Sequence, residues 1–110
     1  MEELANKKIL SHEEMKVLTS DEIDEYLSRL NERWETVESP PVFIRAKYTF
    51  SDFTEAMKFV NKVADIAESA GHHPDITIHY NKVEITLWSH FINGLSINDF
   101  IIAAKIDNIS

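Results

Sequence analysis

The strongest constraint on the fold of this chain is a set of short segments in which apolar and polar residues alternate. One segment extends from Val42 to Phe50, and two further segments cover residues 76–80 and 83–87. A period of two places the apolar side chains on one face of a β-sheet and leaves the other face polar. The two later segments are separated by Asn81-Lys82, and asparagine tolerates the positive φ of a tight turn, so we predict a β-hairpin there.

Three segments with helical periodicity lie before, between and after these strands. Apolar residues recur at intervals of three and four, which is typical of helices that bury one face. Ser51 is the predicted N-cap of the second helix and Ser96 that of the third. The predicted helices extend from the capping box of Thr19 and Glu22 to about Leu30, from about Asp52 to Ala70, and from Ser96 to near the C-terminus.

The order of these elements is helix, two strands, helix, two strands, helix, where the first strand pair is Trp34–Val37 and Val42–Phe50. Paired strands favour an antiparallel sheet with helices on one face, and 110 residues accommodate one domain. We therefore predict a single α+β domain over residues 18–110, with a four-stranded antiparallel sheet and three helices packed on one face. Residues 1–17 show little periodicity and are expected to form a flexible N-terminal arm.

Composition disfavours several classes of protein. The formal charge of −8 disfavours binding to nucleic acid or to an anionic membrane surface, because both need a basic patch. No apolar run approaches the roughly 20 residues that cross a bilayer. The chain has no cysteine, and its N-terminus lacks the basic start and apolar core of a secretory signal. We expect a cytoplasmic protein whose partners are small molecules or other proteins.

Four of the five histidines fall between positions 72 and 90. His72 and His73 follow Gly71, which is placed to end the second helix in the left-handed conformation. His90 lies where the chain leaves the predicted hairpin. Histidine changes its charge near neutral pH, so two imidazoles that face one pocket can divide the roles of acid and base. We interpret His72, His73 and His90 as a candidate acid–base cluster.

Two other interpretations of these histidines remain open. They could be polar loop residues that only hydrogen-bond to nearby backbone groups. Alternatively, they could bind a metal, because nitrogen and oxygen ligands gather in this segment. The available ligands are His72, His73, His79 and His90 with Asp75 or Asp99. No histidine pair stands at i and i+4 of a predicted helix, so we predict no metal site. His12, in the arm, and His79, on the polar face of the hairpin, are expected to face solvent.

A longer pattern surrounds the histidine cluster. It reads Glu68, three residues, His72-His73-Pro74, five residues, Tyr80, nine residues, His90, eight residues and Asp99. This pattern resembles the signature of the pterin-4a-carbinolamine dehydratases. Trp34, residues 80–83 and residues 94–96 are also similar to that family, and the resemblance covers about residues 18–107.

The resemblance implies an activity, which is the removal of water from 4a-hydroxytetrahydropterin to give quinonoid dihydropterin in the recycling of a pterin cofactor. It implies no metal or organic cofactor. His72 and His90 are implied as the proton-transfer pair, with His73 mainly holding the pterin. Asp99 is expected to orient His90, to support the helix start at Ser96, or to do both.

Further residues are expected around the substrate. Gly71, Trp88 and Ser89 are expected to contact it beside the histidines, and Glu68 is expected to support the site. Trp34 is expected to form a wall on which a flat heterocycle stacks, with core packing as the alternative. The resemblance also implies a homodimer or homotetramer. A non-catalytic interaction module on the same fold is the alternative function.

Overall fold

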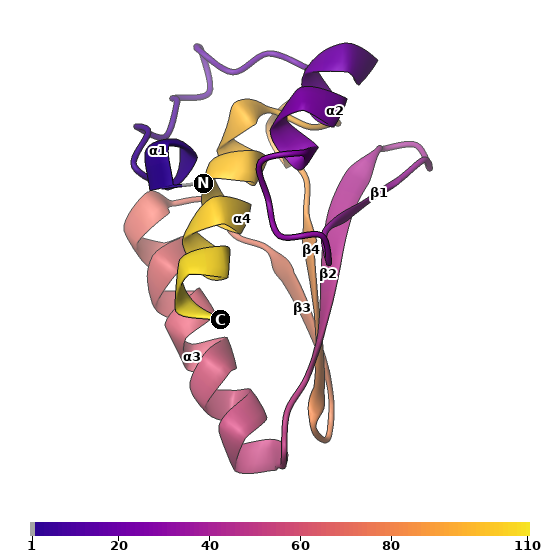
Figure 1. Cartoon of the computed structure of the whole chain (residues 1–110). Helices are drawn as coiled ribbons and strands as arrows, with labels where there is room; N and C mark the ends of the chain where they lie inside the picture. Colours follow the sequence, from indigo (N-terminus) through magenta and orange to yellow (C-terminus); the bar gives the residue numbers. More distant parts are fainter. Residues whose placement is uncertain (1) are drawn as a thin grey trace.

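The computed structural model describes residues 2–110 and contains a four-stranded antiparallel sheet. The spatial order of the strands is β1-β2-β4-β3, so the two strand pairs join where β2 and β4 lie side by side. This confirms the predicted antiparallel sheet, in which β1 and β3 are the edges. The strands are β1 Glu35–Val37, β2 Phe43–Thr49, β3 Asp75–His79 and β4 Lys82–Leu87 (Figure 1).

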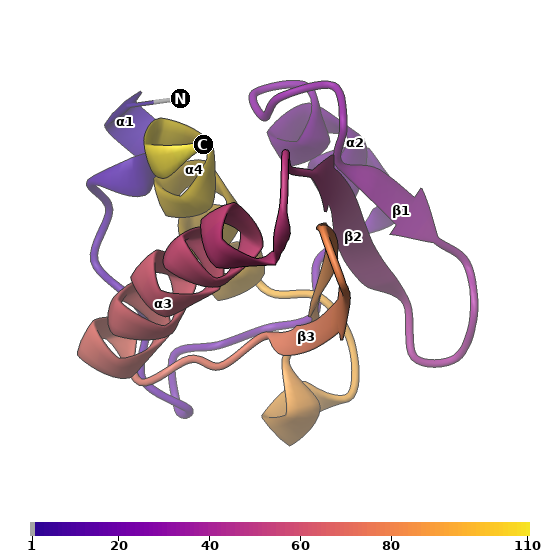
Figure 2. The same cartoon turned by 90° about the horizontal axis from the view of Figure 1, so that it is seen from below.

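The helices form a layer on one face of this sheet, as the two views in Figure 1 and Figure 2 show. The predicted α+β class is confirmed, and the structure adds two short elements, one before the predicted set and one between its last strand and its last helix. No helix within residues 2–110 is long and apolar enough to cross a membrane. The helices are α1 Glu2–Ala5, α2 Ser20–Leu27, α3 Phe53–Ala70 and α4 Ile97–Ile109, with a 3-10 turn, η1, at His90–Ile92.

Helix α4 lies at the centre of the helical layer. Residues 98–104 are all buried, and α1, α2 and α3 each contact this helix. A helix that is apolar around most of its circumference is stable only when other elements cover it. On the sheet, the opposed residues of β2 and β4 that point to the core are also buried. These pairs are Ile44–Leu87, Ala46–Ile85 and Tyr48–Val83.

Two of the predicted turn and cap residues differ from those in the structure. Asp52, not Ser51, is the N-cap of α3, and its Oδ1 accepts the Glu55 N–H at 2.9 Å. In the hairpin, Tyr80 adopts the positive φ (53°) that was expected of Asn81. The Asn81 side chain instead donates to the Phe50 carbonyl at 2.9 Å, which ties the hairpin turn to the end of β2. In both cases the observed residue lies one position from the predicted one. The hydrogen bonds of Asp52 to Glu55 and of Asn81 to Phe50 account for the two shifts.

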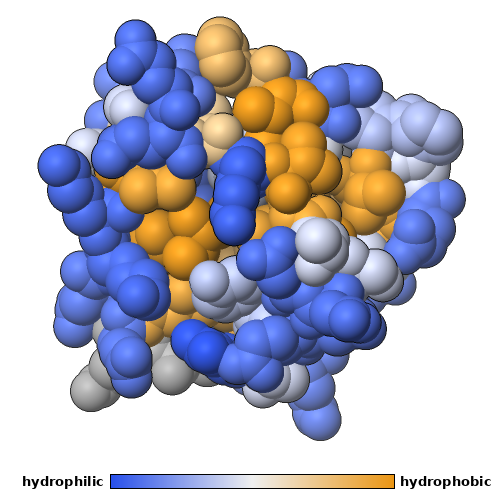
Figure 3. Space-filling model, turned by 90° about the horizontal axis from the view of Figure 1, so that it is seen from above, coloured by the Kyte–Doolittle hydropathy of each residue, from blue (hydrophilic) through white to orange (hydrophobic). Residues whose placement is uncertain are grey.

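The segment before residue 18, which was expected to be a flexible arm, packs against the domain in the structure. Leu4 and Ala5 of α1 are 1% and 2% exposed and belong to the same core as α4. Further along, the Leu18 N–H donates to the Leu95 carbonyl at 2.9 Å. Seen from the end that carries α2 and this segment, apolar side chains gather in the middle between hydrophilic ones (Figure 3). Buried side chains and paired backbone groups mark this segment as part of the packed structure.

We expect the Leu4→Ala variant to lose about 2 kcal/mol of unfolding free energy, measured by urea denaturation. This lies at the lower end of the cost of a buried Leu→Ala change, because a short helix at a chain end can detach locally. Val17→Ala is the control, since Val17 is 57% exposed and its truncation should cost less than about 0.5 kcal/mol. Equal stabilities of the two variants would show that α1 does not contribute to the core in solution.

Candidate active site

A pocket of about 520 Å³ lies where the end of α3, the end of β4 and the N-terminal segment meet. It brings together residues that are far apart in the sequence. The predicted site residues that line it are Gly71, His72, His73, Trp88, Ser89 and His90. The structure adds His12, Met15 and Phe91, which were not expected to be there. Two separate histidine-bearing loops therefore face the same space.

The end of α3 positions His72. Gly71 adopts the left-handed conformation (φ 67°), as predicted, and its N–H donates to the Ala67 carbonyl at 2.9 Å. The His72 N–H donates to the same carbonyl at 3.3 Å. A left-handed glycine at this position turns the chain sharply out of the helix. The turn directs the chain toward the start of α4, where the His72 side chain finds its partner.

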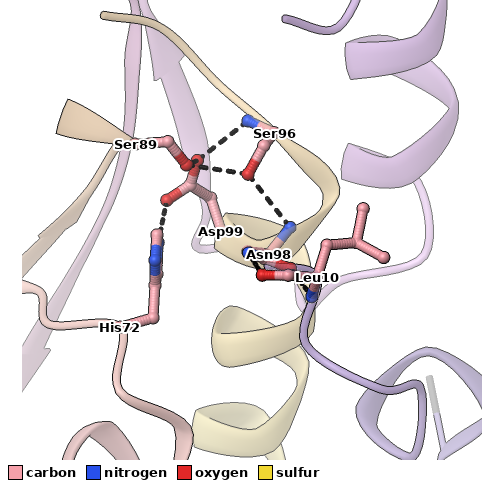
Figure 4. Close-up of polar contacts among 6 residues, drawn as sticks. All are labelled: Leu10, His72, Ser89, Ser96, Asn98 and Asp99. Atoms are coloured by element: carbon pink, nitrogen blue, oxygen red, sulfur yellow. Dashed lines mark hydrogen bonds and ion pairs between the residues drawn. The ribbon is translucent and has the colours of Figure 1, made fainter. Parts of the chain in front are cut away.

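That partner is Asp99, which is completely buried in the first turn of α4. The His72 Nε2 and Asp99 Oδ1 atoms are 2.6 Å apart, and the His72 side chain is 13% exposed (Figure 4). An ionised carboxylate only accepts hydrogen bonds, so Nε2–H of His72 is the donor. This leaves Nδ1 as the ring nitrogen that is not bonded to Asp99.

The other oxygen of Asp99 is held by two further donors. Oδ2 accepts the Ser89 hydroxyl at 2.8 Å and the Ser96 N–H at 3.0 Å. Ser96 in turn donates its hydroxyl to Ser89 Oγ at 2.7 Å and accepts the Asn98 N–H at 3.2 Å. Figure 4 shows that the donors to this carboxylate come from the segment after β4 and from the N-cap of α4. A buried charge is tolerated when donors satisfy it in this way, and the helix N-terminus adds a favourable dipole.

Asp99 was expected to orient His90, and in the structure it pairs with His72 instead. The capping role, which was the other expectation, is present, since Asp99 and Ser96 form a capping box. The two roles use different oxygens of the same carboxylate. The helix cap therefore fixes the carboxylate, and the carboxylate fixes the imidazole of His72.

A small loop after β4 brings His90 to the pocket. Two backbone hydrogen bonds between Ser89 and Gly94 join the ends of this loop. The Ser89 N–H donates to the Gly94 carbonyl at 2.8 Å, and the Gly94 N–H donates to the Ser89 carbonyl at 3.3 Å. Asn93, in the left-handed region (φ 54°), turns the chain back after η1. The exposed His90 ring stacks on Trp88 with ring centroids 3.8 Å apart. The backbone and this stack restrict the position of His90, and no carboxylate among the described side chains bonds to its ring.

His73 and Glu68 form a separate pair at the surface. His73 Nε2 lies 2.6 Å from Glu68 Oε1, with the two side chains 59% and 80% exposed. Exposed pairs of this kind contribute little to stability, because solvent screens them. Glu68 therefore contacts a histidine of the pocket without lining the pocket itself.

Trp34 lies away from this pocket, contrary to the expectation that it forms a wall. Its side chain is 3% exposed, and its indole N–H donates to Asp107 Oδ1 at 2.9 Å. The alternative, core packing, describes its position. His12 is exposed, as expected, but it also stacks on Phe91 with ring centroids 4.3 Å apart and lines the pocket. No local pattern around His12 indicates this contact.

Among residues 2–110, no group of three or more His, Cys, Asp or Glu side chains is arranged to hold a metal ion.

Comparison with known proteins adds sequence relatives. The family described as pterin 4 alpha carbinolamine dehydratase matches residues 16–109. A protein from Alkaliphilus metalliredigens is 42% identical over 90 residues, which cover 82% of this chain and 79% of that protein. One from Legionella pneumophila is 44% identical over 92 residues, which cover 84% and 80%. Both are named as candidate pterin-4-alpha-carbinolamine dehydratases.

Solved structures share the fold. A crystal structure from Brucella melitensis, described as a transcriptional coactivator/pterin dehydratase, has a TM-score of 0.80 and 34% identity, and the match covers 86% of this chain and 98% of that one. A pterin dehydratase-like protein described as a RuBisCO assembly factor has a TM-score of 0.60 at 23% identity, covering 69% and 87%. The second likeness concerns the fold alone.

Proposed function

Because the chain belongs to the pterin-4a-carbinolamine dehydratase family, we propose that it converts 4a-hydroxytetrahydropterin to quinonoid dihydropterin and water. In this reaction the C4a–O bond breaks, N5 loses its proton, and a C4a–N5 double bond forms. The departing hydroxyl needs an acid and N5 needs a base. The observation that carries the proposal is the bond of the buried Asp99 to His72 at a pocket that both His72 and His90 line.

The proposed roles follow from the chemistry of the two rings. His72 and His90 are the proton-transfer pair, one acting as acid and the other as base. Asp99 keeps the hydrogen of His72 on Nε2, so that Nδ1 serves the substrate. His73 mainly holds the pterin. Proton transfer between side chains and substrate completes the reaction, so the proposed mechanism uses no metal and no organic cofactor.

The pocket also has features suited to a flat heterocycle. The rings of Trp88 and His90 are stacked and line its wall. Aromatic faces bind planar ring systems through offset stacking and burial of apolar area. Gly71 and Ser89 are proposed to contact the substrate between the two histidine-bearing loops.

We further propose that the protein works in the cytoplasm as a homodimer or homotetramer. The edge strands β1 and β3 have one side without a strand partner in the sheet. An unpaired edge offers backbone donors and acceptors to a second chain. Size-exclusion chromatography with light scattering tests this part, and a monomer at micromolar concentration would contradict it.

The activity itself is tested with the wild-type protein. The carbinolamine is generated in solution, and the decay of its absorbance is compared with the spontaneous rate. We expect clear acceleration by the wild type and by a His79→Gln control, because His79 is exposed on β3 and does not line the pocket. A decay no faster than the spontaneous rate would overturn the proposal. It would favour the alternative function, a non-catalytic interaction module. The Brucella protein is described as a transcriptional coactivator as well as a pterin dehydratase, which agrees with that alternative.

A further inference from the structure

We propose that the N-terminal segment from Leu10 to Leu18 is a wall of the substrate pocket, and that His12 and Phe91 together form a stacking surface for the bound heterocycle. The inference rests on the proposed function, because it assigns two further residues to the binding of the same substrate. It makes His12 a determinant of affinity and not a participant in proton transfer.

The N-terminal segment is anchored at both ends. The Leu10 N–H donates to Asn98 Oδ1 at 2.8 Å, and Asn98 Nδ2 donates to the Leu10 carbonyl at 3.0 Å. Asn98 is 1% exposed, so these bonds are protected from water. At the other end, the buried Leu18 donates its N–H to the Leu95 carbonyl. Between these two anchors the chain has little freedom to move away from the pocket.

The Asn98 anchor lies in the same helical turn as the buried carboxylate of Asp99. Asn98 immediately precedes Asp99 in the first turn of α4, as Figure 4 shows for Leu10, Asn98 and Asp99. One helical turn therefore positions both the His72 ring and the N-terminal segment. Asn98 holds the N-terminal segment and Asp99 holds His72, so these two adjacent side chains fix the position of the wall relative to His72.

The two rings are exposed at the edge of the pocket. His12 and Phe91 stack at an interplanar angle of 16°, and both line the pocket with His72 and His90. Phe91 is 64% exposed, so its ring is accessible to a ligand in the pocket. An exposed aromatic pair at the edge of a pocket gains apolar contact when a planar ligand covers it. A pterin ring is such a ligand.

The two rings relate differently to the region that the dehydratase family matches. His12 lies before residue 16, where the match begins. Phe91 and the proposed proton-transfer residues fall within the matched region. The proposed stacking surface therefore joins one ring from outside the matched region to one from inside it.

The test compares His12→Ala with Glu13→Ala, an exposed neighbour that does not line the pocket. We expect His12→Ala to raise KM for the carbinolamine by roughly 3- to 10-fold, the usual effect of losing one aromatic contact, with kcat changed by less than about 2-fold. The dissociation constant for 6-methylpterin, which cannot undergo dehydration, should rise by the same factor in calorimetric titration. His12→Phe should restore both values, and Glu13→Ala should change neither.

The outcomes separate this inference from the proposed function. If the wild type accelerates dehydration while His12→Ala keeps wild-type KM and 6-methylpterin affinity, the inference is wrong and the function stands. A fall in kcat at unchanged KM also overturns the inference, because His12 would then act on the chemistry. A wild type that neither accelerates dehydration nor binds 6-methylpterin overturns both.

Discussion

The Asp99→Asn variant is expected to lose roughly 100-fold or more in kcat/KM. Asparagine has nearly the same shape as aspartate, but one of its two terminal groups is a donor. If its carbonyl faces His72, its NH2 group opposes two existing donors, the Ser89 hydroxyl and the Ser96 N–H. If the NH2 group faces His72 instead, the hydrogen of the imidazole moves to Nδ1. The first arrangement disturbs the position of the His72 ring, and the second removes the proton-accepting nitrogen, Nδ1, from the substrate.

A second comparison separates this effect from loss of the helix cap. Ser96→Ala removes the capping hydroxyl but leaves the His72–Asp99 contact, so it should cost about 1 kcal/mol of stability and less than roughly 10-fold in kcat/KM. The double variant Asp99→Asn/His72→Ala should be no slower than the slower single variant, because residues that act as a unit are not additive. Steady-state kinetics and thermal unfolding measure both. A folded Asp99→Asn protein with near wild-type kcat/KM would reduce Asp99 to a helix-capping acid.

Features that depend on local chemistry were predictable from the sequence. The Thr19–Glu22 capping box and the left-handed Gly71 appear in the structure as predicted. Each depends on contacts within a few residues, where side-chain type and spacing decide the conformation. The hairpin was also predictable from local sequence, because apolar and polar residues alternate along both of its strands. Its turn residue was displaced by one position, since the long-range Asn81–Phe50 bond also acts there.

Features that depend on long-range contacts were not predictable in the same way. The signature identified Asp99, but its partner His72 lies 27 residues away in the sequence. Trp34 was assigned to the pocket, whereas its hydrogen bond to Asp107 joins residues 73 positions apart. The N-terminal segment is held by a contact that spans 88 positions, from Leu10 to Asn98. The packing of α4 determines all three contacts, and no periodicity in one segment encodes how another segment packs against it.

The His90→Ala variant is expected to lose roughly 100-fold in kcat, the usual contribution of one positioned acid or base. Its stability should change by less than about 0.5 kcal/mol, because the side chain is exposed. The Ser89–Gly94 backbone bridge does not involve the imidazole, so the loop should keep its shape. Thermal unfolding and single-turnover kinetics check these two expectations on the same sample.

The His90→Gln variant decides what kind of group the reaction needs at this position. Glutamine can donate and accept hydrogen bonds, but it does not take up or release a proton near neutral pH. We expect it to be as slow as His90→Ala if His90 transfers a proton. Free imidazole should then partly restore the rate of His90→Ala, because the site of the missing ring is open to solvent. A His90→Gln protein within about 3-fold of the wild-type kcat would show that His90 only binds the substrate, and proton transfer would then depend on the His72–Asp99 pair alone.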